Sequence, residues 1–515
     1  MTARRSSRWS PSLLLALLTL AALALRLLAL GSKSLLTDEG SSYYFSQLPL
    51  ATLLWRLCDP HPPGYYLFLR VVAVAGHSEA WLRWPSALAG ALAVPLTWLL
   101  AREAMRPLDR PDGQEQAWAA LLAAGLVAFA PLHVWYSQEA RPYALLATLA
   151  LLLAWAGLRW WLRPSAGAAL LFLLAGWAAL FVEYGTLLAW GGLNLFLLAG
   201  WPWRQATGTA SAGRVRAWLA LQGLLLLPFA IWWLVSPQRA VLAGPSYQAV
   251  FLAVRARSLG LALTPQGART VVAATLGAIA LLGVACAVAV RSSQRVRHWL
   301  GSPLVAALLV GLVLLLAAGG VAPQLYTVKR HLTVAVPPLA IAASWAVMRH
   351  AGGRARVLRV AMLGVLAACL LLSLLAVLAV PKPAWREATA ALAGEVAPED
   401  AVWVDELDVP VFAYYWQDRG AWQPLYSGNL AALDAVPEGQ RAWLVGTVSP
   451  YRDLMADLPP DFAIHRQVAV QVDFPGIALR AYDYTDGGQP VAPPSQAMRW
   501  GLDLPSPLDT SCTGR

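Results

Sequence analysis

Residues 12–30 read SLLLALLTLAALALRLLAL, and the acidic pair Asp38-Glu39 follows a few residues later. After Ser12 this run is polar only at Thr19 and Arg26, and it is long enough to cross a bilayer as a helix. Residues 1–10, just before the run, carry three arginines. The positive-inside rule therefore predicts a cytoplasmic N-terminus, with the acidic pair emerging at the outer surface of the membrane.

The composition is that of a membrane protein. The chain has 515 residues, of which 58% are hydrophobic and only 13% are charged. With a mean hydropathy of +0.54, this is typical of a polytopic protein rather than of a soluble domain. The net charge is +11, but the arginines fall mostly in short loops between apolar runs. That placement indicates topology and attraction to anionic membrane lipids, so nucleic acid is not an expected partner.

Apolar runs of about the length of a membrane span recur along residues 1–380. We therefore predict an all-α polytopic domain there, with about eleven transmembrane helices. The runs are Ser12–Leu30, Trp84–Leu100, Ala117–Pro131, Tyr143–Leu162, Ala168–Phe181, Thr186–Gly200, Trp218–Val235, Val271–Val290, Leu300–Gly319, Leu332–Val347 and Leu358–Val380.

The loops between these runs favour one orientation. If the first loop, residues 31–83, lies outside, the arginine-bearing loops at 102–110, 159–163, 204–216, 291–297 and 349–359 all lie inside. The run His61–Gly76 is also apolar, but it opens with two prolines, contains Arg70 and is short for a span. We interpret it as a helix lying along the outer interface.

The composition changes after Val380 to that of an ordinary globular domain. Residues 381–486 are predicted to form a small α/β domain, which an odd number of spans places outside the cell. Its predicted elements are a helix at Glu387–Leu392 and strands at Ala401–Val404, Ala442–Val445 and Ala478–Tyr482. Residues 487–515 are rich in Pro, Ser and Gly and are predicted to be a flexible tail.

The pair Asp38-Glu39 is the first candidate for chemistry. A carboxylate within hydrogen-bond reach of an acceptor hydroxyl can take its proton, as a general base, while a new bond forms. A structural role is the alternative, because Thr37 and Asp38 are both good helix N-cap residues.

A second polar segment, DPHPP at residues 59–63, lies in the same outer loop. Proline fixes φ, so the flanking prolines would hold the loop stiffly and aim Asp59 and His61. A divalent metal held by His61 with Asp59 or Glu39 is an alternative, but no dense cluster of ligands favours it. No cofactor is therefore expected.

Two further outer turns carry polar residues. Residues 136–143 read YSQEARPY. Polar residues are common in turns, but a glutamate and an arginine together, as at Glu139 and Arg141, are less common at a membrane face. Residues 329–331 read KRH, just before a span, and a cation cluster there suits a phosphate at headgroup depth. Plain anchoring at the interface is the alternative for this cluster.

The joint order of these motifs resembles a known family. Asp38-Glu39, then DPHPP at 59–63, then WLRWPSA at 81–87 resembles the first outer loop of the protein O-mannosyltransferase superfamily. These are integral-membrane glycosyltransferases of the GT-C fold, family 39. YSQEARPY, with Arg330-His331 and Pro337-Pro338, resembles its broad bacterial branch, which includes aminoarabinose and galacturonic-acid transferases acting on lipid A. The resemblance covers about residues 10–350.

The resemblance implies a polyprenyl-phosphate sugar donor and an inverting transfer outside the cytoplasm, from the plasma or inner membrane. Asp38 matches the family's catalytic acidic residue, with Glu39 beside it, and Arg83 matches an arginine that the family needs. The chain lacks the large lumenal insert of the eukaryotic protein mannosyltransferases, and its C-terminal segment is a different small domain. The acceptor, a lipid, glycan or protein, and the sugar stay open.

We therefore expect a glycosyltransferase with Asp38 as the base and Glu39 beside it. The residues expected to hold the donor phosphate are Arg83, Arg141, Lys329 and Arg330. Those expected to orient the donor or acceptor are Asp59, His61, Gln138, Glu139 and Tyr143. The alternatives are a transporter of lipid-linked sugars and a non-catalytic subunit of an envelope assembly. A transporter would favour ionisable groups near the bilayer midplane and inverted repeats, whereas here the charges lie at one face and no repeat is evident.

Overall fold

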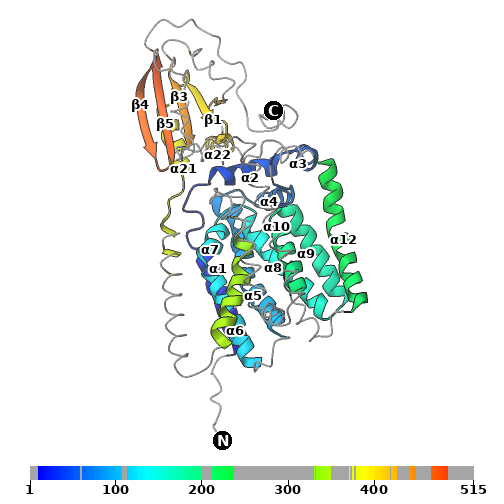
Figure 1. Ribbon diagram of the computed structural model, residues 1–515. Helices are drawn as coiled ribbons and strands as arrows, with labels where there is room; N and C mark the ends of the chain where they lie inside the picture. The colour runs from blue at the N-terminus through cyan, green and yellow to red at the C-terminus, as the bar shows by residue number, and fades with distance from the viewer. Residues whose placement is uncertain are drawn as a thin grey trace, which may run out of the picture.

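The computed structural model describes residues 10–57, 59, 61–106, 113–199, 211–236, 330, 332–349, 371, 374, 375, 378–417, 419–425, 436, 440–447 and 466–484. The described part is a bundle of helices with a five-stranded sheet beyond one end of it (Figure 1). Two of the predicted spans, Val271–Val290 and Leu300–Gly319, lie outside the described residues, and Leu358–Val380 lies largely outside them.

Eight of the predicted apolar runs fall on helices of the bundle. These helices are α1 (Pro11–Leu27), α5 (Glu79–Met105), α6 (Gly113–Ala128), α8 (Tyr143–Leu162), α9 (Ala166–Val182), α10 (Thr186–Ala199), α12 (Ala212–Val235) and α19 (Val336–Arg349), the last preceded by a short 3₁₀ turn at Leu332–Val334. Four of them begin after a serine whose hydroxyl accepts a first-turn amide hydrogen, which satisfies an otherwise unpaired donor. Those serines are Ser10, Ser78, Ser165 and Ser211.

By length and composition, α5, α8 and α12 can each cross a membrane. The pair α6 and α7 (Pro131–Ser137) would make a fourth span, bent by 55° at its break. Other apolar helices, including α1, α9 and α19, are shorter. The chain is thus a mostly helical membrane protein, and the total of eleven spans stays a prediction.

The break between α6 and α7 is stabilised by a buried arginine from α1. The Arg26 guanidinium donates to the carbonyl oxygen of Ala128 at 3.0 Å and to the hydroxyl of Ser137 at 3.1 Å. Helix ends leave carbonyls without intrahelical partners, and inside a membrane these groups need partners from the protein. Arg26 supplies one to Ala128 and also binds Ser137, so it holds α6 and α7 together across the break.

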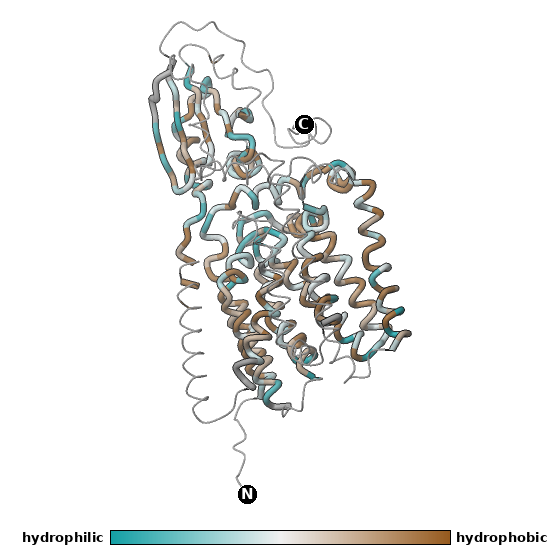
Figure 2. The backbone as a smooth tube through the Cα atoms, in the orientation of Figure 1, coloured by the Kyte–Doolittle hydropathy of each residue, from teal (hydrophilic) through white to brown (hydrophobic). Residues whose placement is uncertain are grey.

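Three short helices cover this end of the bundle (Figure 1). They are α2 (Thr37–Gln47), α3 (Leu50–Trp55) and α4 (Gly64–Ala73). At ten residues, α4 is shorter than a span, and it occupies most of the run expected to lie along the interface. Hydrophilic segments gather around α2, whereas the body of the bundle is mostly hydrophobic (Figure 2). The α5 helix begins earlier than its predicted run, so Arg83 belongs to this helix rather than to the loop before it.

The C-terminal segment folds as a sheet with the strand order β2-β1-β3-β5-β4. The strands are β1 (Ala401–Asp405), β2 (Gln423–Leu425), β3 (Ala442–Thr447), β4 (Arg466–Phe474) and β5 (Ile477–Tyr484). The β1 strand is parallel to β2 and β3, and β5 is antiparallel to β3 and β4. Helices α21 (Trp385–Glu395) and α22 (Val409–Trp416) lie on the side of the sheet that faces the bundle (Figure 1). The predicted helix and strands fall within α21, β1, β3 and β5, whereas α22, β2 and β4 were not predicted.

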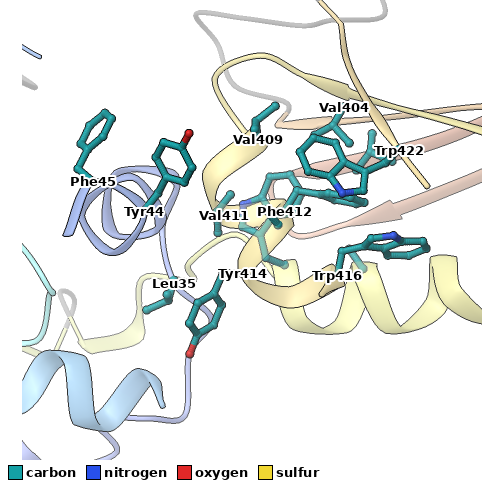
Figure 3. Close-up of a cluster of buried hydrophobic side chains, with 14 of the residues drawn as sticks. Leu35, Tyr44, Phe45, Val404, Val409, Val411, Phe412, Tyr414, Trp416 and Trp422 are labelled. Carbon is teal, nitrogen blue, oxygen red and sulfur yellow. The ribbon is translucent and has the colours of Figure 1, made fainter. Parts of the chain in front are cut away.

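One hydrophobic core joins this segment to α2. It extends from Tyr66 of α4 through Phe45 of α2 to Val411 and Phe412 of α22. Figure 3 shows Leu35 and Tyr44 close to α22, with Phe45 on the side of α2 away from it. The two helices meet at Gly40, where a Cβ atom would lie 2.6 Å from the Cα and Cβ of Val411. Only glycine allows this approach, so the sheet and α2 form one packed unit.

Candidate active site

Asp38 lies in the first turn of α2, at the hydrophilic end of the bundle. Its side chain is 44% exposed, and its Oδ2 lies 2.8 Å from Nη2 of Arg330 and 3.8 Å from Nη2 of Arg141. Burial by itself would raise the pKa of Asp38, but Arg330 and Arg141 outweigh it and lower the pKa to about 2. The group is therefore an accessible carboxylate held by two cations from distant parts of the chain.

Arg141 lies in the turn between α7 and α8 and is almost fully buried. One of its terminal nitrogens donates to the carbonyl oxygen of Asp38 at 3.0 Å and to Oγ of Ser42 at 2.9 Å. The other donates to the hydroxyl of Tyr143 at 3.2 Å. Its Nε is buried and has no hydrogen-bond partner among the described residues. A buried donor without a partner is costly, so a hydrogen-bond acceptor brought beside this nitrogen would be stabilised.

Tyr143 lies between the two arginines. Its hydroxyl accepts from Nη1 of Arg330 at 3.0 Å as well as from Arg141. Each guanidinium carbon lies over the tyrosine ring, at 5.5 Å from its centre for Arg330 and 5.6 Å for Arg141. The ring therefore fixes the spacing of two like charges that would otherwise repel each other.

His61 and Asp59 lie beside Arg141. Oδ1 of Asp59 accepts from Nδ1 of His61 at 2.9 Å and from the hydroxyl of Tyr66 at 2.7 Å. On the other side of the ring, Nε2 lies 3.6 Å from Oε2 of Glu183. Burial alone would lower the pKa of His61, but Glu183 and Asp59 outweigh it and raise the pKa to about 9. His61 is therefore a third cation in the site at neutral pH.

Glu39 and Arg83 form a separate buried pair. Arg83 Nε lies 2.7 Å from Oε1 of Glu39, and its Nη2 lies 2.8 Å from Oε2. The remaining N–H groups of Arg83 donate to carbonyl oxygens of residues 30, 33 and 34. All five donors of the guanidinium are thus engaged. Burial would raise the pKa of Glu39, but Arg83 and Lys382 hold it well below its usual range.

The structure therefore divides the predicted residues into groups. Asp38, Arg141, Tyr143, His61 and Arg330 form one polar cluster, with Asp59 behind His61. Arg83 and Glu39 are adjacent to it, but their polar atoms are committed to each other and to the backbone. The side-chain amide of Gln138 donates toward α1, to the carbonyl oxygen of Leu28 at 3.0 Å.

Glu139 and Lys329 complete the set of predicted residues. Glu139 is buried, and burial raises its pKa to about 7, with Lys382 opposing the rise and Glu39 adding to it. Lys329 lies outside the described residues. No three His, Cys, Asp or Glu side chains are grouped to hold a metal ion in the part of the chain that the structure describes.

The chain is similar to known proteins in sequence over one segment and in fold over most of its length. Residues 50–188 match the family model described as the Protein O-mannosyl-transferase TMEM260 N-terminal domain. The crystal structure of ArnT from Cupriavidus metallidurans in the apo state superposes with a TM-score of 0.54 at 14% identity, covering 90% of this chain and 97% of that chain. The structure of the same protein bound to undecaprenyl phosphate gives a TM-score of 0.52 with the same identity and coverage. No curated protein sequence matches the chain.

The chain has the GT-C fold. The predicted GT-C fold is thereby confirmed. The sequence does not indicate Lys382 or Tyr66 as site residues, and the polar turn at Glu183-Tyr184 is only a weak signal. Lys382 follows the last apolar run and looks like an interfacial anchor. Tyr66 and Glu183 sit in or beside apolar runs, and only the folded chain brings them against Asp59 and His61.

Proposed function

We propose that this GT-C protein transfers a sugar from a polyprenyl-phosphate donor to an acceptor hydroxyl on the extracytoplasmic side of the membrane. The observation that carries the proposal is the convergence of Arg141 and Arg330 on Asp38, with the buried Nε of Arg141 unpartnered among the described residues. Two arginines at the hydrophilic end of the bundle suit a lipid phosphate, and an adjacent exposed carboxylate suits a base. ArnT, which shares the fold, is described as bound to undecaprenyl phosphate.

The arginines and Asp38 would act in sequence. The donor phosphate would take the place of the Asp38 carboxylate at Arg330 and would also meet the free Nε of Arg141. Asp38, released from its cations, would regain basicity, because the two arginines are what hold its pKa low. The bound phosphate would therefore both fill the site and activate the base.

The reaction would proceed by inversion. Asp38 would take the proton of the acceptor hydroxyl, and the oxygen of that hydroxyl would form a bond to the anomeric carbon of the sugar. The bond between that carbon and the phosphate oxygen would break, and its electron pair would leave with the polyprenyl phosphate. Arg141, Arg330 and protonated His61 would stabilise the added negative charge on the leaving phosphate. Arg83 would have a structural role: it would hold the Glu39 side chain in place, and Glu39 would in turn fix the first turn of α2.

Purified protein in proteoliposomes tests the proposal. A set of undecaprenyl-phosphate sugars would be supplied with an envelope lipid and glycan extract, and release of undecaprenyl phosphate with sugar transfer would be measured by mass spectrometry. We expect wild type to release undecaprenyl phosphate and Arg330→Ala to do so poorly. Arg56→Ala, which removes an exposed arginine just after α3 and outside the polar cluster, is the control and should behave like wild type. Movement of labelled lipid across the bilayer without sugar release would favour the transporter instead.

A further inference from the structure

Lys382 reaches the active-site region from the segment that leads into the C-terminal sheet. Its Nζ lies 3.1 Å from Oε2 of Glu39 and 3.3 Å from the carbonyl oxygen of Gln138. The side chain is 5% exposed, so the ammonium is removed from water and its charge is balanced by Glu39. A buried charge pair of this kind is costly to break, because the remaining partner stays buried and unpaired.

Glu39 connects four segments through its two oxygens. Oε1 accepts from the Ala140 amide at 2.8 Å, and Oε2 accepts from the Leu36 amide at 2.9 Å. Arg83 of α5 and Lys382 complete the set. The carboxylate thus ties the start of α2 to α5, to the turn that carries Arg141, and to the C-terminal segment. Asp38 is the preceding residue, so its position depends on this junction.

The position of Lys382 depends in turn on the sheet. The Ala384 amide donates to the carbonyl oxygen of Pro475, in the turn between β4 and β5, at 3.0 Å. On the bundle side, Arg386 binds Glu79 at the start of α5 and the carbonyl oxygen of Gly31. The segment is therefore held between the sheet and the bundle, and Lys382 is aimed at Glu39 only when both are in contact with it.

We propose that Lys382 is a positioning residue through which the C-terminal domain sets the geometry of the catalytic turn. It acts on Asp38 through Glu39 and does not touch the donor. The C-terminal domain then helps to position the active site, because it supplies Lys382, one of the two cations that bind Glu39. The expected effect of Lys382 on the turnover rate rests on the proposed function. Its expected effect on the position of the first turn of α2 does not.

Hydrogen exchange on the full chain in nanodiscs tests the positioning role without any substrate. In Lys382→Met, which removes the charge but keeps the length, we expect exchange to speed up about tenfold at residues 36–42 and 138–141. Residues 385–395 should exchange as in wild type. Lys33→Met is the matched control, because Lys33 also binds this segment, at the carbonyl oxygens of Leu378 and Val380, but no carboxylate of α2. It should leave both regions unchanged.

Turnover of undecaprenyl-phosphate sugars gives the second readout. A displacement of about 1 Å at a catalytic group can cost on the order of a hundredfold in rate, so Lys382→Met should lower kcat by about tenfold to a hundredfold with little change in KM. Lys382→Arg, which can still pair with Glu39, should recover most of the loss.

Each outcome is decisive. Faster exchange that includes residues 385–395 would show that Lys382 merely tethers the domain, and unchanged exchange at 36–42 would show that it does not hold the catalytic turn. Either result overturns the proposal. If exchange changes as expected while wild type releases no undecaprenyl phosphate, the positioning role stands and the proposed function fails.

Discussion

The carboxylate of Asp38 and the guanidinium of Arg330 lie 2.8 Å apart, although one belongs to the first turn of α2 and the other to the segment before α19. Nη2 of Arg141 lies 3.8 Å from the same carboxylate oxygen, so two cations from distant parts of the chain meet at Asp38. In the proposed function, the donor phosphate would take the place of the Asp38 carboxylate at Arg330. A base and its substrate would therefore compete for the same cations.

Replacement of Asp38 by asparagine should separate catalysis from binding. Asn keeps the shape of Asp, and the N-cap position of α2 is Leu36 rather than Asp38, so the fold should be retained. Turnover should fall by about a hundredfold to ten-thousandfold, as expected for loss of a general base. Affinity for undecaprenyl phosphate should rise on the order of tenfold, or about 1.4 kcal/mol, because the competing carboxylate is gone. Weaker binding of undecaprenyl phosphate by Asp38→Asn in a fluorescence titration would contradict this competition.

The arginines should differ in what they contribute. Arg330→Ala should weaken undecaprenyl phosphate binding by roughly ten- to a hundredfold, corresponding to one lost charge-assisted contact of about 1.5–3 kcal/mol. Arg83→Ala should instead lower the free energy of unfolding by about 3–5 kcal/mol, because Glu39 would stay buried without its main partner. Thermal unfolding in detergent and lipid titration distinguish the two. Loss of binding in a stably folded Arg83→Ala protein would assign Arg83 to the phosphate.

Stability should depend on pH through His61. Its pKa in the folded protein is raised to about 9 from an ordinary value of 6.5, so the charged form stabilises the fold. That contribution is complete below about pH 6.5 and is lost as the pH rises from there through 9. The midpoint of thermal unfolding should decline over this interval in wild type, and the decline should be smaller in His61→Gln. His77→Gln, at an exposed position outside the cluster, serves as the control and should keep the wild-type slope.

The contact between α2 and α22 should not tolerate a side chain at Gly40. Gly40→Ala places a Cβ atom 2.6 Å from Val411, and the two helices must separate to accept it. We expect a loss of about 1–3 kcal/mol in stability, the usual cost of overpacking. Gly394→Ala, where an added Cβ meets nothing within 4 Å, is the matched control and should be neutral or stabilising. Equal unfolding temperatures for the two variants would show that the helices are not packed as described.

The orientation of the chain can be read by cysteine labelling. After the four native cysteines are replaced by serine, Ser41→Cys should react with a membrane-impermeant maleimide added from outside, and Gly208→Cys should react only after permeabilisation. The physical reason is the inward bias of arginines in the short loops. The reverse pattern would place the polar cluster in the cytoplasm.

The sequence alone determined the membrane class, the bounds of helices such as α8 and the GT-C fold family, because these follow from local hydrophobic runs and from the order of short motifs. It also singled out Asp38, His61, Arg141 and Arg330. The break between α6 and α7 falls at Pro131, where the predicted run ends, but the sequence did not indicate that Arg26 of α1 would bind the carbonyl left free there. Nor did it indicate the strand β4, whose short apolar alternation is a weak local signal.

Tertiary structure alone decided which of the charged residues meet. Asp38 and Glu39 are neighbours in sequence, yet one is open to a ligand and the other is sealed against Arg83 and Lys382. Successive residues of a helix point about 100° apart, so the turn that exposes one carboxylate buries the next. The partner of a buried carboxylate can lie far away in the sequence. The sequence near residue 38 therefore cannot predict that Lys382 binds Glu39.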